Sequence, residues 1–171
     1  MRLFLAVKLS AAMKDSLIGI QNEWYDAGIR GHYTPEENLH ITLAFIGEYP
    51  DPDEVLKALR TVEFRPFELA LWGYGNFGDL WWAGTDDSPA LEAVVRRVRR
   101  ALEEAGIPFD RKRFVPHITV LRHAEPGRSG LPALTIPPAR MTVRRISLMR
   151  SDRGRSGMVY TELGAVEASR P

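Results

Sequence analysis

The sequence predicts an α+β fold in which two similar halves face each other and helices pack on the outside. Three observations lead to this prediction. Segments with helical and strand periodicity follow one another irregularly, unlike the regular alternation of a parallel α/β sheet. An apolar strand that carries one histidine and one threonine occurs twice, at His40 and at His117. A long helical segment precedes each of these strands, which indicates a repeated unit.

The first half of the chain is expected to contain two helices and four strands. Ser10 is a capping residue for a helix over residues 10–27, which carries an apolar stripe on one face. A second helix is expected over residues 54–62. The strands of this half are expected at residues 3–9, 39–46, 67–74 and 80–83.

The third helix has the clearest start signal in the chain. Ser88 is a capping residue, and Pro89 occupies the first helical position. An apolar stripe continues towards Gly106, which ends the helix. The remaining strands are expected at residues 114–121, 135–136, 142–149 and 158–163, with loops at 124–130 and 151–157 and a tail at 167–171.

The composition excludes several classes of protein. The chain has 171 residues, of which 44% are hydrophobic, enough for one domain with a substantial core. The absence of cysteine excludes disulfides, zinc–thiolate sites and a cysteine nucleophile. The 23 basic and 22 acidic residues nearly cancel, unlike those of a protein that coats duplex nucleic acid. Because no signal peptide and no apolar span of roughly 20 residues is present, we expect a cytoplasmic protein without a membrane partner.

The two His-Ile-Thr sequences are the strongest functional signal. Residues i and i+2 of a strand point to the same face, so His40 lies beside Thr42 and His117 beside Thr119. A single histidine in a strand is more often an ordinary core residue. Polar side chains that face a dry core are unfavourable, so the repetition of the pair predicts a shared polar cavity between the halves.

These side chains suit the opening of a cyclic phosphodiester. One histidine can act as a base towards water while the other protonates the leaving sugar oxygen, each typically contributing about 10²–10⁴-fold. The threonine hydroxyls can hold the non-bridging oxygens and stabilise the charge that develops there. The residues alone do not say which histidine takes which role.

The chain resembles the 2H phosphoesterase superfamily and, more narrowly, the RNA 2′,3′-cyclic phosphodiesterase (2′-5′ RNA ligase) family. The matching stretches are MRLFLAVKL, ENLHITLAFIGE, RFVPHITVLR and ISLMRSDRGRSGMVYTEL. Val120 replaces the leucine that is more common in the family. The resemblance implies a bilobal fold with two antiparallel β-sheets that face a central cleft and helices packed outside. Residues 1–171 then form a single domain of two similar intertwined lobes, each with one His-x-Thr motif.

The resemblance also implies an activity. It implies hydrolysis of RNA 2′,3′-cyclic phosphate ends to 2′-phosphomonoesters without a metal and, in reverse, 2′-5′ ligation of RNA. It implies that His40 is the proton donor and His117 the proton acceptor. No cofactor or metal is expected. The expected partner is an RNA or oligonucleotide with a 2′,3′-cyclic phosphate end, and we expect a monomer.

Several residues around the motifs are weaker candidates. Arg122 matches a family arginine and is expected to bind the substrate phosphate with Thr42 and Thr119, although strand parity points it away from His117 unless the strand bulges. Phe114 is expected either to wall the pocket or stack on a base, or to pack in the core. His32 and His123 are interpreted as surface histidines, because neither has a partner motif.

Two alternatives to this enzyme remain open. One is a non-catalytic module on the same fold that binds RNA ends, although binding alone would not need two titrating groups. The other is a metallohydrolase with His40 and His117 as ligands. Metal sites usually need three or four ligands, and neither motif contains a further one.

Overall fold

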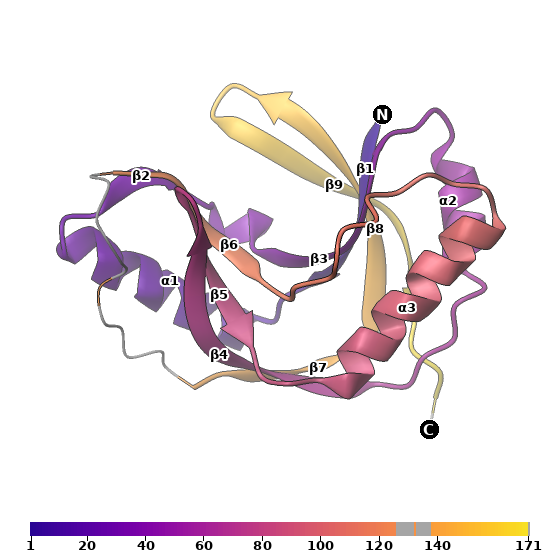
Figure 1. Ribbon diagram of the computed structural model, residues 1–171, viewed down its shortest axis with the longest axis horizontal. Helices are drawn as coiled ribbons and strands as arrows, with labels where there is room; N and C mark the ends of the chain where they lie inside the picture. The colour runs from indigo at the N-terminus through magenta and orange to yellow at the C-terminus, as the bar shows by residue number, and fades with distance from the viewer. Residues whose placement is uncertain (126–131, 133–137, 171) are drawn as a thin grey trace.

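The computed structural model describes residues 1–125, 132 and 138–170, which form two antiparallel sheets with α-helices packed against them (Figure 1). The predicted α+β class is therefore confirmed. The expected strand at 135–136 and the greater part of the expected loop at 124–130 lie outside the described residues. No helix of the described segments is long and apolar enough to cross a membrane.

The four-stranded sheet has the order β3-β1-β8-β9. Its strands are β3 (His40–Glu48), β1 (Arg2–Lys8), β8 (Arg145–Gly154) and β9 (Gly157–Glu167). The central strand β1 is buried along five consecutive residues, from Leu3 to Val7. A strand with both faces covered reads as a continuous apolar run, which is how the sequence of β1 reads.

The five-stranded sheet has the order β2-β6-β5-β4-β7 and is strongly curled (Figure 1). Its strands are β2 (Arg30–Tyr33), β6 (Ile118–Glu125), β5 (Leu80–Thr85), β4 (Phe67–Phe77) and β7 (Arg140–Val143). The two sheets therefore each carry one His-x-Thr sequence, on β3 in the first and, in the second, at His117, which immediately precedes β6, and Thr119 within it.

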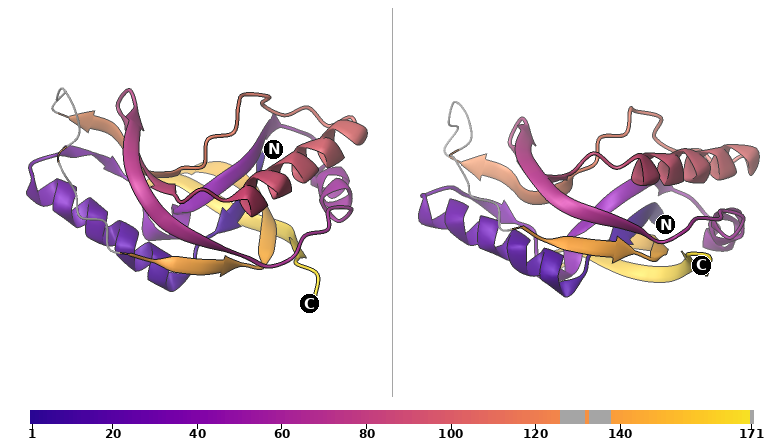
Figure 2. Two further views of the ribbon diagram at one scale, coloured as in Figure 1. Left: turned by 60° about the horizontal axis from the view of Figure 1, so that its bottom comes forward. Right: turned by 90° about the horizontal axis from the view of Figure 1, so that it is seen from below.

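The two long helices, α1 (Ala11–Asp26) and α3 (Pro89–Glu104), each pack against the sheet that does not contain the His-x-Thr strand following them in the chain. α1 packs on the five-stranded sheet, where Trp24 meets the edge of Trp81 with ring centroids 5.1 Å apart. α2 (Pro52–Leu59) contacts β9 and α3 contacts β3, both in the four-stranded sheet. α1 accordingly lies at the end of the molecule away from α2 and α3 (Figure 2). The core that results is continuous between the sheets.

The helix starts follow the sequence signals. The side chain of Ser10 accepts a hydrogen bond from the Met13 amide, and Ser88 caps α3 in the same way through the Leu91 amide. The apolar stripes are buried as predicted, with Leu17, Ile20 and Trp24 of α1 fully buried. α2 starts earlier than predicted, because Asp51 caps it and Pro52 opens it, and it ends at Leu59.

The structure differs from the sequence-based expectation in three places along the strands. Residues 142–149 are not one strand: β7 ends at Val143, and the chain passes at Arg144 into the other sheet as β8. The expected loop at 151–157 is mostly strand, because β8 and β9 continue to Gly154 and Gly157. β2 was not predicted, since its sequence RGHY lacks the apolar residues that mark a strand.

The expected tail is also ordered by hydrogen bonds. β9 extends to Glu167, the amide of Ala168 donates to the Arg144 carbonyl at 2.7 Å, and the amide of Ser169 donates to the Phe64 carbonyl at 2.8 Å. These bonds attach the end of the chain to two other segments, so residues 167–169 do not form the free tail that was expected.

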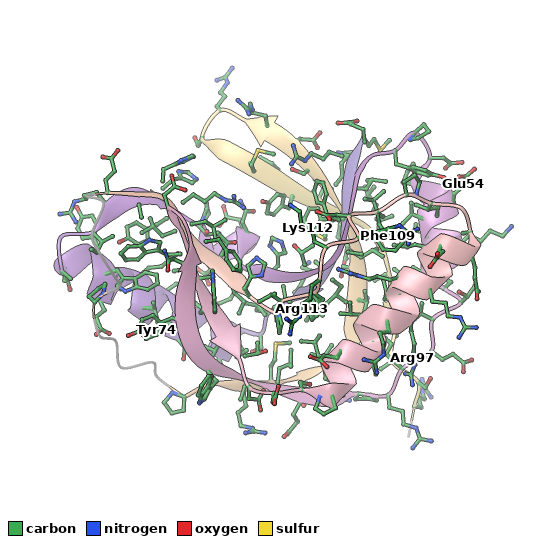
Figure 3. The ribbon with its side chains drawn as sticks, in the orientation of Figure 1. Glu54, Tyr74, Arg97, Phe109, Lys112 and Arg113 are labelled. Carbon is green, nitrogen blue, oxygen red and sulfur yellow. The ribbon has the colours of Figure 1, made fainter. Side chains whose placement is uncertain are left out.

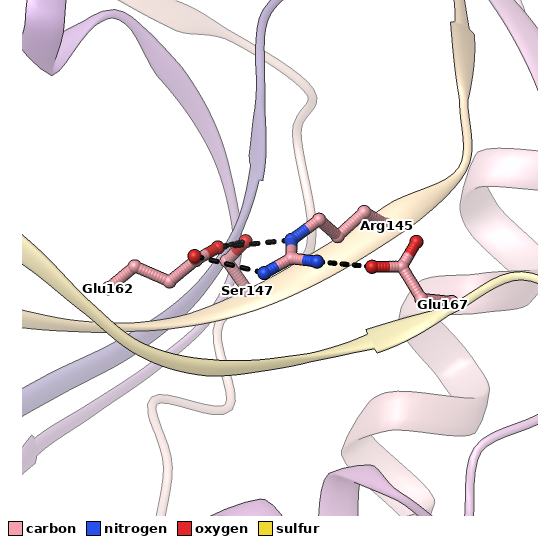
Figure 4. Close-up of polar contacts among 4 residues, drawn as sticks. All are labelled: Arg145, Ser147, Glu162 and Glu167. Atoms are coloured by element: carbon pink, nitrogen blue, oxygen red, sulfur yellow. Dashed lines mark hydrogen bonds and ion pairs between the residues drawn. The ribbon is translucent and has the colours of Figure 1, made fainter.

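An ion-pair network joins β8 to β9 (Figure 4). The guanidinium of Arg145 donates to Glu162 at 3.0 and 3.3 Å and also pairs with Glu167, while the hydroxyl of Ser147 donates to Glu162. The hydrogen bond from Arg145 is the main reason why the pKa of Glu162 lies below its ordinary value. A carboxyl group whose pKa falls on folding stabilises the protein above its unfolded pKa, and this contribution is lost as pH falls through the folded value.

We therefore expect Glu162→Gln to lower the free energy of unfolding by about 0.5–1 kcal/mol at neutral pH. The difference from the wild type should be smaller at a second, acid pH below 4.5, because protonation of Glu162 removes the charge of the ion pair. Urea denaturation at both pH values measures it. A deficit that is as large in acid as at neutral pH would show that packing, and not the ion pair, is the cause.

Candidate active site

A cleft of about 330 Å³ lies between the two sheets and contains both histidines. Its walls come from β1, β3, β8 and β9 on one side and from β5, β6 and the residue before β6 on the other. The lining residues are Arg2, Phe4, His40, Thr42, Phe45, Leu80, His117, Thr119, Arg122, Ser151, Met158 and Tyr160. The structure thus brings together both His-x-Thr pairs and Arg122. A larger groove of about 820 Å³, beside α3, contains neither histidine.

His40 is held by its own backbone segment. The short 3-10 helix η1 (Glu36–Asn38) directs the Asn38 carbonyl at Nδ1 of His40, 2.7 Å away. A carbonyl can only accept, so Nδ1 carries the hydrogen and Nε2 is the nitrogen that can exchange a proton with a substrate. Nε2 lies 2.9 Å from Oγ1 of Thr42. The buried side chain of Asn38 in turn donates to the Met158 carbonyl at 2.9 Å, which links this segment to β9.

His117 repeats this arrangement in the other sheet. Its Nδ1 lies 2.7 Å from the carbonyl of Val115, again two residues earlier, so Nε2 is again the nitrogen left for the substrate. β6 begins at Ile118, and His117 therefore ends the segment that connects α3 to the strand. The amide of Asp110 in this segment donates to the Phe45 carbonyl of β3 at 2.8 Å. Phe109, Lys112 and Arg113 mark the course of the segment between the two sheets (Figure 3).

Aromatic rings surround each imidazole. The ring of His40 lies 5.0 Å from that of Phe4 and 5.3 Å from that of Tyr160. The ring of His117 lies 5.2 Å from that of Phe77 and 6.4 Å from that of Trp82. These rings restrict the orientation of both histidines, so that the hydrogen bonds to Nδ1 and the ring contacts together fix where each Nε2 points.

The pKa of His40 is lowered from its ordinary value of 6.5. Desolvation by burial is the largest cause, and the electrostatic interactions with His117 and Arg122 act in the same direction, while the hydrogen bond to Asn38 opposes them. The imidazole of His40 therefore gives up its proton more readily than a histidine side chain in water. An anion in the cleft would counter the positive charge of Arg122 and raise this pKa.

A β-bulge turns Arg122 into the cleft. On β5, Trp82 pairs with Thr119 and Trp81 with Leu121, so Val120 is an extra residue in β6. Val120 and Leu121 are both fully buried, and Arg122 consequently points to the same side as Thr119. The sequence left this outcome open, because simple strand parity points Arg122 away from His117.

The His40 strand has a bulge at the equivalent place. On β1, Ala6 pairs with Thr42 and Leu5 with Ala44, so Leu43 is the extra residue of β3. The residue three positions after each threonine therefore returns to the cleft, Arg122 in one sheet and Phe45 in the other. The two motifs thus share the His-Ile-Thr sequence and also the β-bulge that follows it.

For Phe114 the structure decides between the two readings, and His32 and His123 are exposed, as expected for surface histidines. Phe114 does not line the cleft and packs against the core, because the strand begins four residues later than predicted and its alternation does not extend back to this position. His32 lines a small pocket of about 60 Å³ that adjoins the cleft and also contains His40 and Arg122. His123 is exposed and lies 3.5 Å from a carboxylate oxygen of Asp79.

Sequence reasoning missed one wall of the cleft. Arg2, Phe4, Phe45 and Tyr160 all line it, yet none belongs to the two motifs. Phe45 could have been found only by assuming that its strand bulges. The signal at Arg2 is a cation at the start of an apolar first strand, which is too common a pattern to indicate a site. Among the described residues, no group of three or more His, Asp or Glu side chains could hold a metal ion.

Two antiparallel sheets that each present a His-x-Thr pair to one cleft define a 2H phosphoesterase fold. Comparison with known proteins supports this. The profile of the 2′-5′ RNA ligase superfamily matches residues 19–155. An RNA 2′,3′-cyclic phosphodiesterase from Thermus thermophilus is 31% identical over 183 residues, covering 95% of this chain and 88% of the relative. For one from Thermotoga maritima the values are 27% over 175 residues, 95% and 93%.

The fold is similar to solved structures over almost its whole length. The crystal structure of E. coli LigT without ligand has a TM-score of 0.82 and 26% identity, covering 99% of this chain and 98% of LigT. LigT complexed with 3′-AMP gives 0.82 and 27%. A relative from Geobacillus stearothermophilus is longer, and this chain matches 41% of it. These findings show that the chain belongs to the 2′-5′ RNA ligase superfamily.

Proposed function

We propose that this protein hydrolyses RNA 2′,3′-cyclic phosphate ends to 2′-phosphomonoesters by acid–base catalysis with two histidines. The observation that carries the proposal is the symmetric presentation of His40 and His117 in one cleft. Each has Nδ1 tied to a carbonyl two residues earlier and Nε2 left for the substrate. The relatives named RNA 2′,3′-cyclic phosphodiesterase support the choice of substrate.

In the proposed reaction, Nε2 of neutral His117 takes a proton from water, and the resulting hydroxide attacks phosphorus. The bond from phosphorus to O3′ breaks, and Nε2 of protonated His40 gives its proton to O3′. The product carries the phosphate on O2′. In-line displacement needs the attacking and leaving oxygens on opposite sides of phosphorus, which two histidines on facing sheets can serve.

The other cleft residues have supporting roles in this proposal. The hydroxyls of Thr42 and Thr119 donate to the non-bridging oxygens, and the guanidinium of Arg122 balances the charge that develops on them. If the 5′-hydroxyl of a second RNA replaces water as the nucleophile, the same steps form a 2′-5′ linkage. The single-domain organisation with two intertwined lobes, the monomeric state and the cytoplasmic location stay predictions.

Product analysis tests the function directly. The wild-type protein is incubated with cytidine 2′,3′-cyclic phosphate in the presence of a chelator, and the product is separated from authentic 2′- and 3′-monophosphates. We expect the 2′-monophosphate alone. Tight binding without turnover would favour the non-catalytic RNA-end binding module, and a 3′-monophosphate would show that the leaving oxygen is O2′.

The proposal that His40 is the acid requires substrate to change its protonation. We expect the pKa of His40 in the free protein to lie below 6.5 and to rise when a nucleoside 2′-monophosphate binds, because the phosphate opposes the positive charge of Arg122. The alkaline limb of kcat should accordingly lie at higher pH than that of kcat/KM, since kcat reports the complex and kcat/KM the free enzyme. Histidine NMR titration with and without the nucleotide measures the shift. A pKa that stays unchanged on binding would contradict the assignment.

A further inference from the structure

The cleft contains more cationic side chains than are required to balance the single negative charge of one cyclic phosphate. The cleft residues include two guanidinium groups, of Arg2 and Arg122, besides the two histidines, and none of them is Asp or Glu. A 2′,3′-cyclic phosphate carries a single negative charge. In the pairing of β1 with β3, Arg2 lies opposite Glu48 at one end of the pair, whereas His40 lies opposite Lys8 at the other end. The charge of Arg2 therefore lies away from the reacting phosphate, within the same cleft.

Arg2 lies beside Phe45, which occupies the position in the four-stranded sheet that Arg122 occupies in the other sheet. The residue three positions after the threonine is Arg122 in one sheet and Phe45 in the other. The four-stranded sheet thus lacks a cation at the position of Arg122. The neighbouring strand β1 supplies one instead, because the guanidinium carbon of Arg2 lies 5.1 Å from the centre of the Phe45 ring.

Arg2 is ordered and yet free to bind an anion. Its backbone lies between β3 and β8, opposite Glu48 and Ser151, so the strand cannot shift easily. The ring of Phe45 supports the guanidinium, which leaves N–H groups free for phosphate oxygens. Within the described part of the chain Arg2 forms no ion pair: Glu48 pairs with the amino group of Met1, and Asp152 pairs with Arg150.

We infer that Arg2, stacked on Phe45, binds the phosphate that joins the last two nucleotides of the RNA, one nucleotide before the cyclic end. This inference rests on the proposed function and extends it, since it makes the cleft a site for an oligonucleotide in preference to a mononucleotide. Ser151, which lies opposite Arg2 on β8 and also lines the cleft, can donate a further hydrogen bond to that phosphate.

A pair of substrates tests this subsite. One is cytidine 2′,3′-cyclic phosphate, and the other is the dinucleotide in which adenosine is joined to the same cyclic cytidine through a 3′-5′ phosphate. We expect Arg2→Gln to raise KM for the dinucleotide about tenfold, the effect of losing one charged hydrogen bond. It should leave kcat/KM for the mononucleotide unchanged. Arg96→Gln, which removes an exposed arginine of α3 outside the cleft, is the matched control and should alter neither substrate.

A third substrate makes the test independent of any substitution. In this dinucleotide a neutral methylphosphonate replaces the internucleotide phosphate. The wild type should lose about the same tenfold in KM, and Arg2→Gln should bind the charged and neutral dinucleotides equally. An equal loss by Arg2→Gln on mononucleotide and dinucleotide would mean that Arg2 serves the cyclic phosphate. No loss on either, or a wild type that does not distinguish the two dinucleotides, would overturn the inference. Failure of the proposed function would appear differently, as a wild type that turns over no substrate.

Discussion

Replacing His40 or His117 with alanine is expected to lower kcat for a nucleoside 2′,3′-cyclic phosphate by about 10²–10⁴-fold. Each imidazole moves one proton in the proposed reaction, and among the described residues no other histidine and no Asp or Glu lines the cleft. Steady-state turnover measures the loss. Because both variants remove a ring that packs among aromatic residues, their thermal unfolding should be compared with that of the wild type.

His123→Ala is the matched control for these variants. His123 is an exposed histidine whose side chain pairs with Asp79, and it does not line the cleft. Its replacement should leave kcat unchanged. If His40→Ala or His117→Ala retained near-wild-type turnover while folded, catalysis by two histidines would be wrong.

The second large effect is expected at Arg122. Arg122→Gln should lower kcat/KM by about 10²–10³-fold, the usual loss when one donor to a developing negative charge is removed. The same change should raise the pKa of His40, since the positive charge of Arg122 is one of the causes that lower it. Kinetics and histidine NMR titration of one variant therefore report on the same contact in two ways.

Arg122→Lys separates charge from geometry at this position. Lysine keeps the positive charge but not the planar fork that binds two phosphate oxygens, so we expect an activity between those of the wild type and of Arg122→Gln. The pKa of His40 should stay close to that of the wild type in this variant. A pKa that rises in both variants alike would mean that packing around Arg122, and not its charge, controls His40.

The sequence was sufficient for features that depend on local periodicity. The cap at Ser10, the start of α3 at Ser88 and Pro89, and the pairing of each histidine with a threonine on one face all follow from spacing within a few residues. The repetition of the His-Ile-Thr sequence pointed to the shared cleft, because a polar pair is tolerated in an apolar strand only where something polar faces it.

Features that depend on pairing between distant strands were not predictable. The bulges at Leu43 and Val120 arise from the register with β1 and β5. An apolar residue at either position is equally compatible with a regular strand. The register with β1 also brings Arg2 to Phe45. The change of sheet at Arg144 leaves no local mark, since residues on both sides have strand character.

The central claim is the division of roles between the two histidines, and a single substrate tests it. In cytidine 2′,3′-cyclic phosphorothiolate with sulfur in place of O3′, the leaving group is a thiolate, which departs without protonation because a thiol is far more acidic than an alcohol. His40→Ala should recover most of its lost rate on this substrate relative to the wild type, whereas His117→Ala should stay slow because water must still be deprotonated. Recovery by His117→Ala alone would reverse the roles, and recovery by neither would contradict general acid catalysis by His40.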